Sequence, residues 1–80
     1  MDTPIWPSSL LSTVVPSNAT NFTQIARQLY VGVGGDVTVL TQNDVVITFK
    51  NVGSGSTIGP FFIKRVNATG TTATDIVAFG

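Results

Sequence analysis

Residues 36–51 read DVTVLTQNDVVITFKN, and apolar and polar side chains alternate along them with the period of two that is typical of β-strands. Two strands are indicated, 36–41 and 44–51, and the two polar residues between them suit a tight turn. The stretch therefore predicts an antiparallel hairpin. With a two-residue turn, the pairing register would place Asp36 opposite Phe49.

Outward from this hairpin, three further strands are predicted at residues 25–33, 61–68 and 75–79, each bounded by turn-forming residues. The first of them ends at a Gly-Gly pair, 34–35, which suits a turn. Short, closely spaced strands with Gly-rich turns are typical of all-β folds. Residues 24–80 are therefore predicted to form a small antiparallel barrel or sandwich of about five strands.

Residues 1–23 follow neither a helical nor a strand period and are rich in Pro, Ser and Thr, so we expect an extended N-terminal arm. Ordering about 20 residues costs on the order of 30 kcal/mol at ~1.5 kcal/mol per residue. Burying the large apolar side chains of the arm returns roughly 10–20 kcal/mol. The arm should therefore be ordered only against its own domain together with a neighbouring molecule.

Several predicted strands carry apolar residues on both faces, whereas a monomeric antiparallel sheet usually keeps one face polar. The second apolar face can be covered by contacts between subunits or, within one chain, by the arm, and the sequence leaves both open. The arm and the strand that begins after Pro60 supply the candidate partner-binding residues. These are Ile5, Trp6, Leu10, Leu11, Val14, Val15, Phe22, Phe61 and Phe62.

The chain is unusually poor in charge: 10% of its 80 residues are charged, their sum is zero, and 42% are hydrophobic. Soluble domains have about 25% charged residues, and a net charge near zero promotes association. Small domains are often stabilised by disulfides or a metal, but this chain has neither Cys nor His. The remaining source of stability for so small a domain is oligomerisation or docking onto a partner. The composition therefore favours a structural protein.

The same inventory argues against catalysis. The only carboxylates are Asp2, Asp36, Asp44 and Asp75, and the predicted register keeps Asp36 away from Asp44. General acid–base chemistry requires two such groups to converge, and a hard cation requires a cluster of oxygen ligands. We therefore expect no enzymatic activity, no cofactor and no metal site.

A small β-barrel that binds nucleic acid is the alternative from a different functional class, with Tyr30, Phe61 and Phe62 as stacking residues beside Lys64 and Arg65. Strong binding depends on neutralising many phosphates, and the chain has four basic residues in all. We expect no nucleic-acid partner.

No apolar run approaches the roughly 18–20 residues of a membrane helix, and no secretory signal is evident at the N-terminus. We therefore expect no membrane partner and synthesis in the cytoplasm.

Residues 26–39, ARQLYVGVGGDVTV, resemble the core signature of the spike-base proteins of gene transfer agent particles and related tailed phages. Further similar stretches follow in the same order: VITF at 46–49, Asn-Val at 51–52, and IKRVNATGTTATDIVA at 63–78. The arm, 1–23, lies outside the resemblance.

The resemblance implies a small β protein on the capsid exterior of a virion, made in the host cytoplasm, that forms the base on which a head spike or fibre is seated. It also implies three kinds of partner: further copies of the chain in a trimer or pentamer, the major capsid protein, and a spike or fibre protein. A capsid cement or decoration protein, or a structural component of the neck or tail, is the alternative within the same class.

Overall fold

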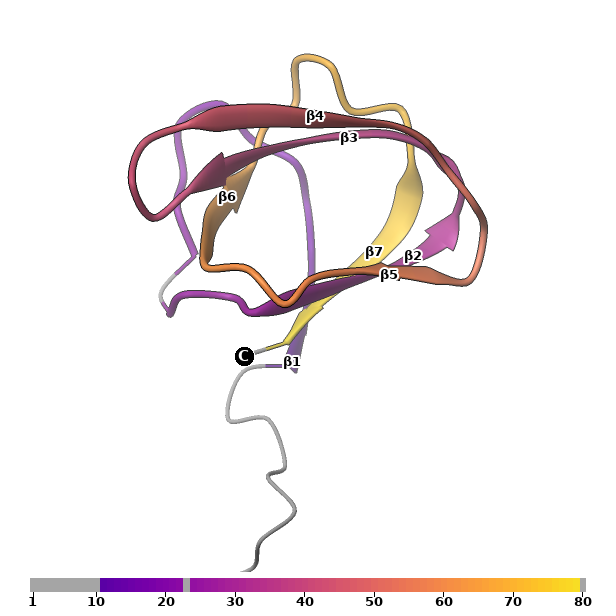
Figure 1. Cartoon of the computed structure of the whole chain (residues 1–80), viewed down its shortest axis with the longest axis horizontal. Helices are drawn as coiled ribbons and strands as arrows, with labels where there is room; N and C mark the ends of the chain where they lie inside the picture. Colours follow the sequence, from indigo (N-terminus) through magenta and orange to yellow (C-terminus); the bar gives the residue numbers. More distant parts are fainter. Residues whose placement is uncertain (1–10, 23, 80) are drawn as a thin grey trace, which may run out of the picture.

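The computed structural model describes residues 11–22 and 24–79, which form two facing antiparallel sheets (Figure 1). One sheet has the strand order β1-β7-β2-β5 and the other β4-β3-β6. The described residues include no helix that could cross a membrane. The all-β antiparallel prediction is confirmed. The strands are β1 (Leu11–Thr13), β2 (Gln28–Val33), β3 (Gly35–Thr41), β4 (Val46–Val52), β5 (Ser56–Ile58), β6 (Ile63–Val66) and β7 (Thr74–Phe79).

Two strands of three residues, β1 and β5, were not predicted. β5 follows a Gly- and Ser-rich stretch, residues 53–56, and it pairs with β2 through Leu29 opposite Ile58 and Val31 opposite Ser56. The turn before it is closed by the Ser56 amide, which donates to the Gly53 carbonyl at 3.1 Å. A strand this short contains too few residues for its period to be recognised.

The link between β2 and β3 is a crossing from one sheet to the other, so the prediction of a turn at residues 34–35 is wrong. β2 and β3 belong to different sheets, and the Gly34 amide donates to Ser54 Oγ at 2.8 Å. A Cβ atom on Gly34 would lie 2.8 Å from the Ser54 nitrogen and 3.1 Å from the Gly53 carbonyl carbon. Glycine is required here because the two backbone segments pass so close together.

β3 and β4 form the predicted hairpin, but their register differs by one residue. Val37, not Asp36, lies opposite Phe49. The turn is one residue longer than predicted because Asp44 (φ 64°) takes the left-handed conformation that ends a common three-residue hairpin loop. Opposed residues share a face, so Phe49 joins Val37 on the side of the sheet that faces the core.

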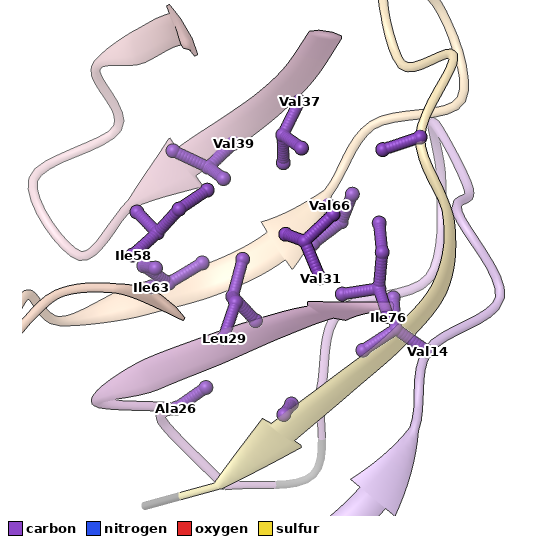
Figure 2. Close-up of a cluster of buried hydrophobic side chains, with 12 residues drawn as sticks. Val14, Ala26, Leu29, Val31, Val37, Val39, Ile58, Ile63, Val66 and Ile76 are labelled. Atoms are coloured by element: carbon purple, nitrogen blue, oxygen red, sulfur yellow. The ribbon is translucent and has the colours of Figure 1, made fainter. Parts of the chain in front are cut away.

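The core lies between the two sheets and is filled by aliphatic side chains (Figure 2). In β2, Leu29 and Val31 are fully buried and Tyr30 between them is exposed, whereas Val33, at the end of the strand, is exposed although it lies on the same face as Leu29 and Val31. The largest fully buried side chains are Leu29, Ile63, Ile76, Val31, Val37, Val39 and Val66.

The described part of the arm, residues 11–22, packs along both sheets. β1 extends the first sheet at the edge of β7, and beyond it the Val14 amide donates to the Ile76 carbonyl at 2.8 Å. The chain then crosses to the second sheet, where the Ser17 amide donates to the Val66 carbonyl of β6 at 2.9 Å. This segment therefore connects the two sheets on one side of the sandwich (Figure 1).

Replacing Gly34 with Ala should lower the free energy of unfolding by about 1–3 kcal/mol, because the added methyl group overpacks a site bounded by backbone atoms. Urea denaturation measures the change as a lower midpoint at constant slope. Gly53→Ala is the matched control, since its Cβ would meet only the end of the Ser56 side chain, at 3.2 Å. Equal stability of the two variants would contradict this account of the crossing.

Candidate protein-interaction surface

Exposed apolar and aromatic side chains gather at the end of the sandwich that carries the β3–β4 loop and the segment before β6. Arg27, Pro60, Phe61 and Phe62 line a hollow of about 500 Å³ there, and we name these four residues the aromatic patch. Phe61 and Phe62 expose 49% and 56% of their surface. Exposed aromatic side chains beside an Arg are the residue types that protein interfaces favour.

The aromatic patch is held by the backbone of the segment that carries it. The Phe61 amide donates to the Arg27 carbonyl at 2.9 Å, and the Phe62 carbonyl accepts from the Gln42 amide at 2.9 Å. The Phe61 ring stacks on Phe49, with centroids 5.9 Å apart and planes 29° apart. Phe49 itself packs against the core, so the exposed rings are connected to the rigid part of the domain.

The predicted strand 61–68 therefore begins later than expected. Phe61 and Phe62 precede β6, which starts at Ile63. The backbone of Phe61 is bonded to Arg27 and that of Ile63 to Ala26, so this part of the chain follows residues 26–27 before β6 joins β3. Sequence reasoning placed both aromatic rings on a strand, whereas they lie in a connecting segment at the edge of the core.

Two of the predicted partner-binding residues contribute to the interior of the domain. Val14 exposes 8% of its surface and belongs to the core, so its apolar side chain is covered by its own chain. Phe22 is half-buried and packs against the core. Their signal in the sequence was apolarity alone, which does not distinguish a core position from an interface position.

The remaining predicted partner-binding residues of the arm have different positions. Val15 is exposed, and Leu11 lies in β1, where its backbone pairs with Phe79. Ile5, Trp6 and Leu10 lie outside the described residues.

Sequence reasoning missed a second exposed apolar surface, on β4. This strand pairs only with β3 in the described sheet, and Val45, Val46 and Ile47 at its start are exposed. An edge strand presents unpaired backbone groups along one side. Alternation identifies the strand but not its place at the edge of the sheet, so no feature of the sequence indicated this surface.

Three of the four basic side chains have polar partners within the domain. Lys50 Nζ lies 3.3 Å from Asp36 Oδ2, and Lys64 Nζ lies 2.6 Å from Asp44 Oδ1. Arg65 Nε donates to the Asn67 side-chain carbonyl at 2.7 Å. Arg27, in the aromatic patch, has no ion pair with any described residue. Little positive charge is left to attract phosphates.

Asp36 fastens the start of β3 to the end of β4. Its Oδ1 accepts from the Asn51 amide at 3.1 Å, and its Oδ2 accepts from Lys50 Nζ. The Asn51 amide bond, with the nearby Lys50 ammonium, holds the pKa of this carboxyl below its ordinary value of 3.8. Within the described residues, no three side chains of the metal-binding types His, Cys, Asp and Glu come together.

No protein-family model and no curated protein matches the chain. Among solved structures, it is similar to a chain in the capsid of a native gene transfer agent (GTA) particle, computed with C5 symmetry. The two are 31% identical over 92% of this chain and 84% of that chain, with a TM-score of 0.79. The chain belongs to the gene transfer agent capsid family. It is a phage-type virion structural protein, and this family membership supports a non-enzymatic role.

The lowered pKa of Asp36 predicts a specific acid response of this GTA capsid-family protein. The stabilising contribution of the carboxylate is complete above the unfolded-state pKa of 3.8 and is lost as the pH falls through the lower folded-state pKa. Asp36→Asn should therefore lower the urea midpoint at about pH 6 and have a smaller effect at about pH 2. A difference between variant and wild type that does not change with pH would contradict this role.

Proposed function

We propose that the protein assembles as a homo-oligomer, a trimer or pentamer, on the exterior of a phage or gene transfer agent head and forms the base that seats a head spike or fibre. The observation that carries the proposal is the exposed aromatic patch on a domain that already has a complete core. The similarity to a GTA capsid chain supports the location in a virion. The major capsid protein and a spike or fibre protein are the proposed partners besides the chain itself.

The energetics favour a protein partner for this surface. Burying a Phe side chain stabilises a complex by about 1.5–3 kcal/mol, and Phe61 and Phe62 both have about half of their surface available. Their backbone is fixed to Arg27 and Gln42, so binding would order few additional groups. Preorganised aromatic side chains are effective anchors because association costs them little conformational entropy.

We further propose a division of labour between an arm, residues 1–23, and a β domain, residues 24–80. Within the arm, residues 11–22 contact the domain itself through β1, Val14 and the backbone bonds to β6. We therefore assign the contact with a partner to residues 1–10, which include Ile5, Trp6 and Leu10. This part would anchor the domain to the capsid or to a neighbouring subunit.

Binding to nucleic acid is the less favoured class. A stacking platform needs cations around its aromatic rings, but only Arg27 has no polar partner among the described residues and lies beside Phe61 and Phe62. Lys50 and Lys64 are paired with carboxylates in the same chain. A single free cation contributes little to phosphate binding.

The position of the protein on the particle tests the proposed role directly. A reconstruction of the particle should show density for this chain on the outer surface of the head, beneath a spike or fibre. Density at capsomer junctions with nothing seated on it would favour a cement or decoration protein. Density at the neck or tail would contradict the proposed location.

Phe62→Ser should reduce the occupancy of the protein on particles by roughly tenfold to a hundredfold at subsaturating concentration, because one buried Phe contributes about 1.5–3 kcal/mol. The free energy of unfolding should change by no more than about 0.5 kcal/mol, since the side chain is exposed. Occupancy is measured from the protein that co-purifies with particles. Val33→Thr is the matched control, because Val33 is 49% exposed at the other end of β2. Equal occupancy of the two variants would remove the aromatic patch from the proposal.

A further inference from the structure

We propose that residues 1–10 of one copy of the chain dock, through Ile5 and Trp6, onto the aromatic patch of the neighbouring copy. Each subunit would then provide an arm to one neighbour and a patch to the other, and the contacts would close into a ring. The inference rests on the proposed function, because it requires a homo-oligomer.

The chain enters the domain next to the aromatic patch. Leu11, the first described residue, lies opposite Phe79 in the pairing of β1 with β7. The Phe79 carbonyl accepts from the Arg27 amide at 2.9 Å, and the Arg27 carbonyl accepts from the Phe61 amide at the same distance. Figure 1 shows the start of β1 beside the end of β7, on the side of the molecule where the segment before β6 passes. Residues 1–10 therefore join the domain within reach of a contact made at this end.

β1 begins at the end of the strand with which it pairs. Leu11 lies opposite Phe79, the last residue of β7. Ten extended residues span about 33 Å. The radius of gyration of a 100-residue domain is about 13 Å. The segment is therefore long enough to contact the next subunit.

The sequence of this segment suits an aromatic surface. Pro4 and Pro7 favour extended conformations at Thr3 and Trp6, the residues that precede them. Extended Pro-containing segments dock onto aromatic-lined grooves with little loss of chain entropy. Asp2 is the only charged side chain of the segment, and Arg27 is the only one of the aromatic patch. Residues 1–10 and the aromatic patch are therefore complementary in charge as well as in their apolar side chains.

Docking within the same chain is less favourable for a geometric reason. To place Ile5 and Trp6 on the patch of their own chain, the segment would have to fold back across the end of β7, where β1 begins. A neighbouring copy can receive the segment without a reversal, and head-to-tail contacts of this kind close into rings.

Cysteine cross-linking of the full-length chain tests the inference, because the natural sequence has no Cys. The double variant Ser8→Cys/Gln42→Cys leaves Ile5, Trp6 and the aromatic patch in place, and Gln42 is exposed next to the patch because its amide bonds to the Phe62 carbonyl. Oxidised at a concentration where it self-associates, this variant should give a ladder of disulfide-linked multimers that stops at the ring size. Linkage within one chain would instead give a covalent monomer of altered electrophoretic mobility and would overturn the inference. The control variant, Ser8→Cys/Ala68→Cys, places its second Cys in the exposed loop after β6 and should not form the ladder.

The single tryptophan supplies a second readout that leaves the docking residues in place. In the wild-type chain, the emission of Trp6 should shift to shorter wavelength as concentration rises and subunits assemble. Phe62→Ser should lose that shift. If the chain self-associates but forms no cross-linked ladder and shows no shift, the arm-to-patch contact is wrong while the proposed function stands. If the wild-type chain neither self-associates nor binds particles, the proposed function itself fails.

Discussion

The backbone hydrogen bonds that fasten residues 11–22 to both sheets determine which surfaces of this domain remain open. They extend the first sheet beyond β7 and cover the free edge of β6 in the second. They also bring Val14 into the core. Among the described residues, the edge of β4 and the aromatic patch are two of the surfaces that stay open. The candidate interaction surface is thus a part of the domain that residues 11–22 do not cover.

Alternation of side chains predicted the strands, but not the buried face of a strand that is apolar on both sides. Leu29 and Val31 in β2, and Ile76 and Ala78 in β7, are buried, while their apolar neighbours Tyr30 and Val77 are not. The register of the β3–β4 hairpin was not predictable from alternation, because it depends on the left-handed conformation of Asp44 in the turn. The backbone conformation of the turn determines the register of a hairpin, whereas the period of two determines only which residues share a face of the strand.

The interaction surface was predictable only in part, for a related reason. Phe61 and Phe62 were recognisable because two consecutive aromatic residues cannot both point into one core. Val14 has the same apolarity as Val15, and only the course of the chain across the sheets buries one and exposes the other. Arg27 joins the aromatic patch through long-range backbone bonds to Phe61 and Phe79 that leave no trace in the local sequence.

The two open apolar surfaces differ in the assemblies they would favour. A regular edge strand can pair with the edge strand of another molecule, and this pairing leads to open-ended aggregation. Proteins prevent it with charged residues and irregular backbone in the edge strand. β4 has both: Lys50 lies in its second half, and Asn51 takes a left-handed conformation (φ 54°) that interrupts the ladder to β3. The aromatic patch has no such protection. A side-chain contact of fixed direction can close on itself, so the arrangement favours a finite ring built on the patch over a growing sheet built on β4.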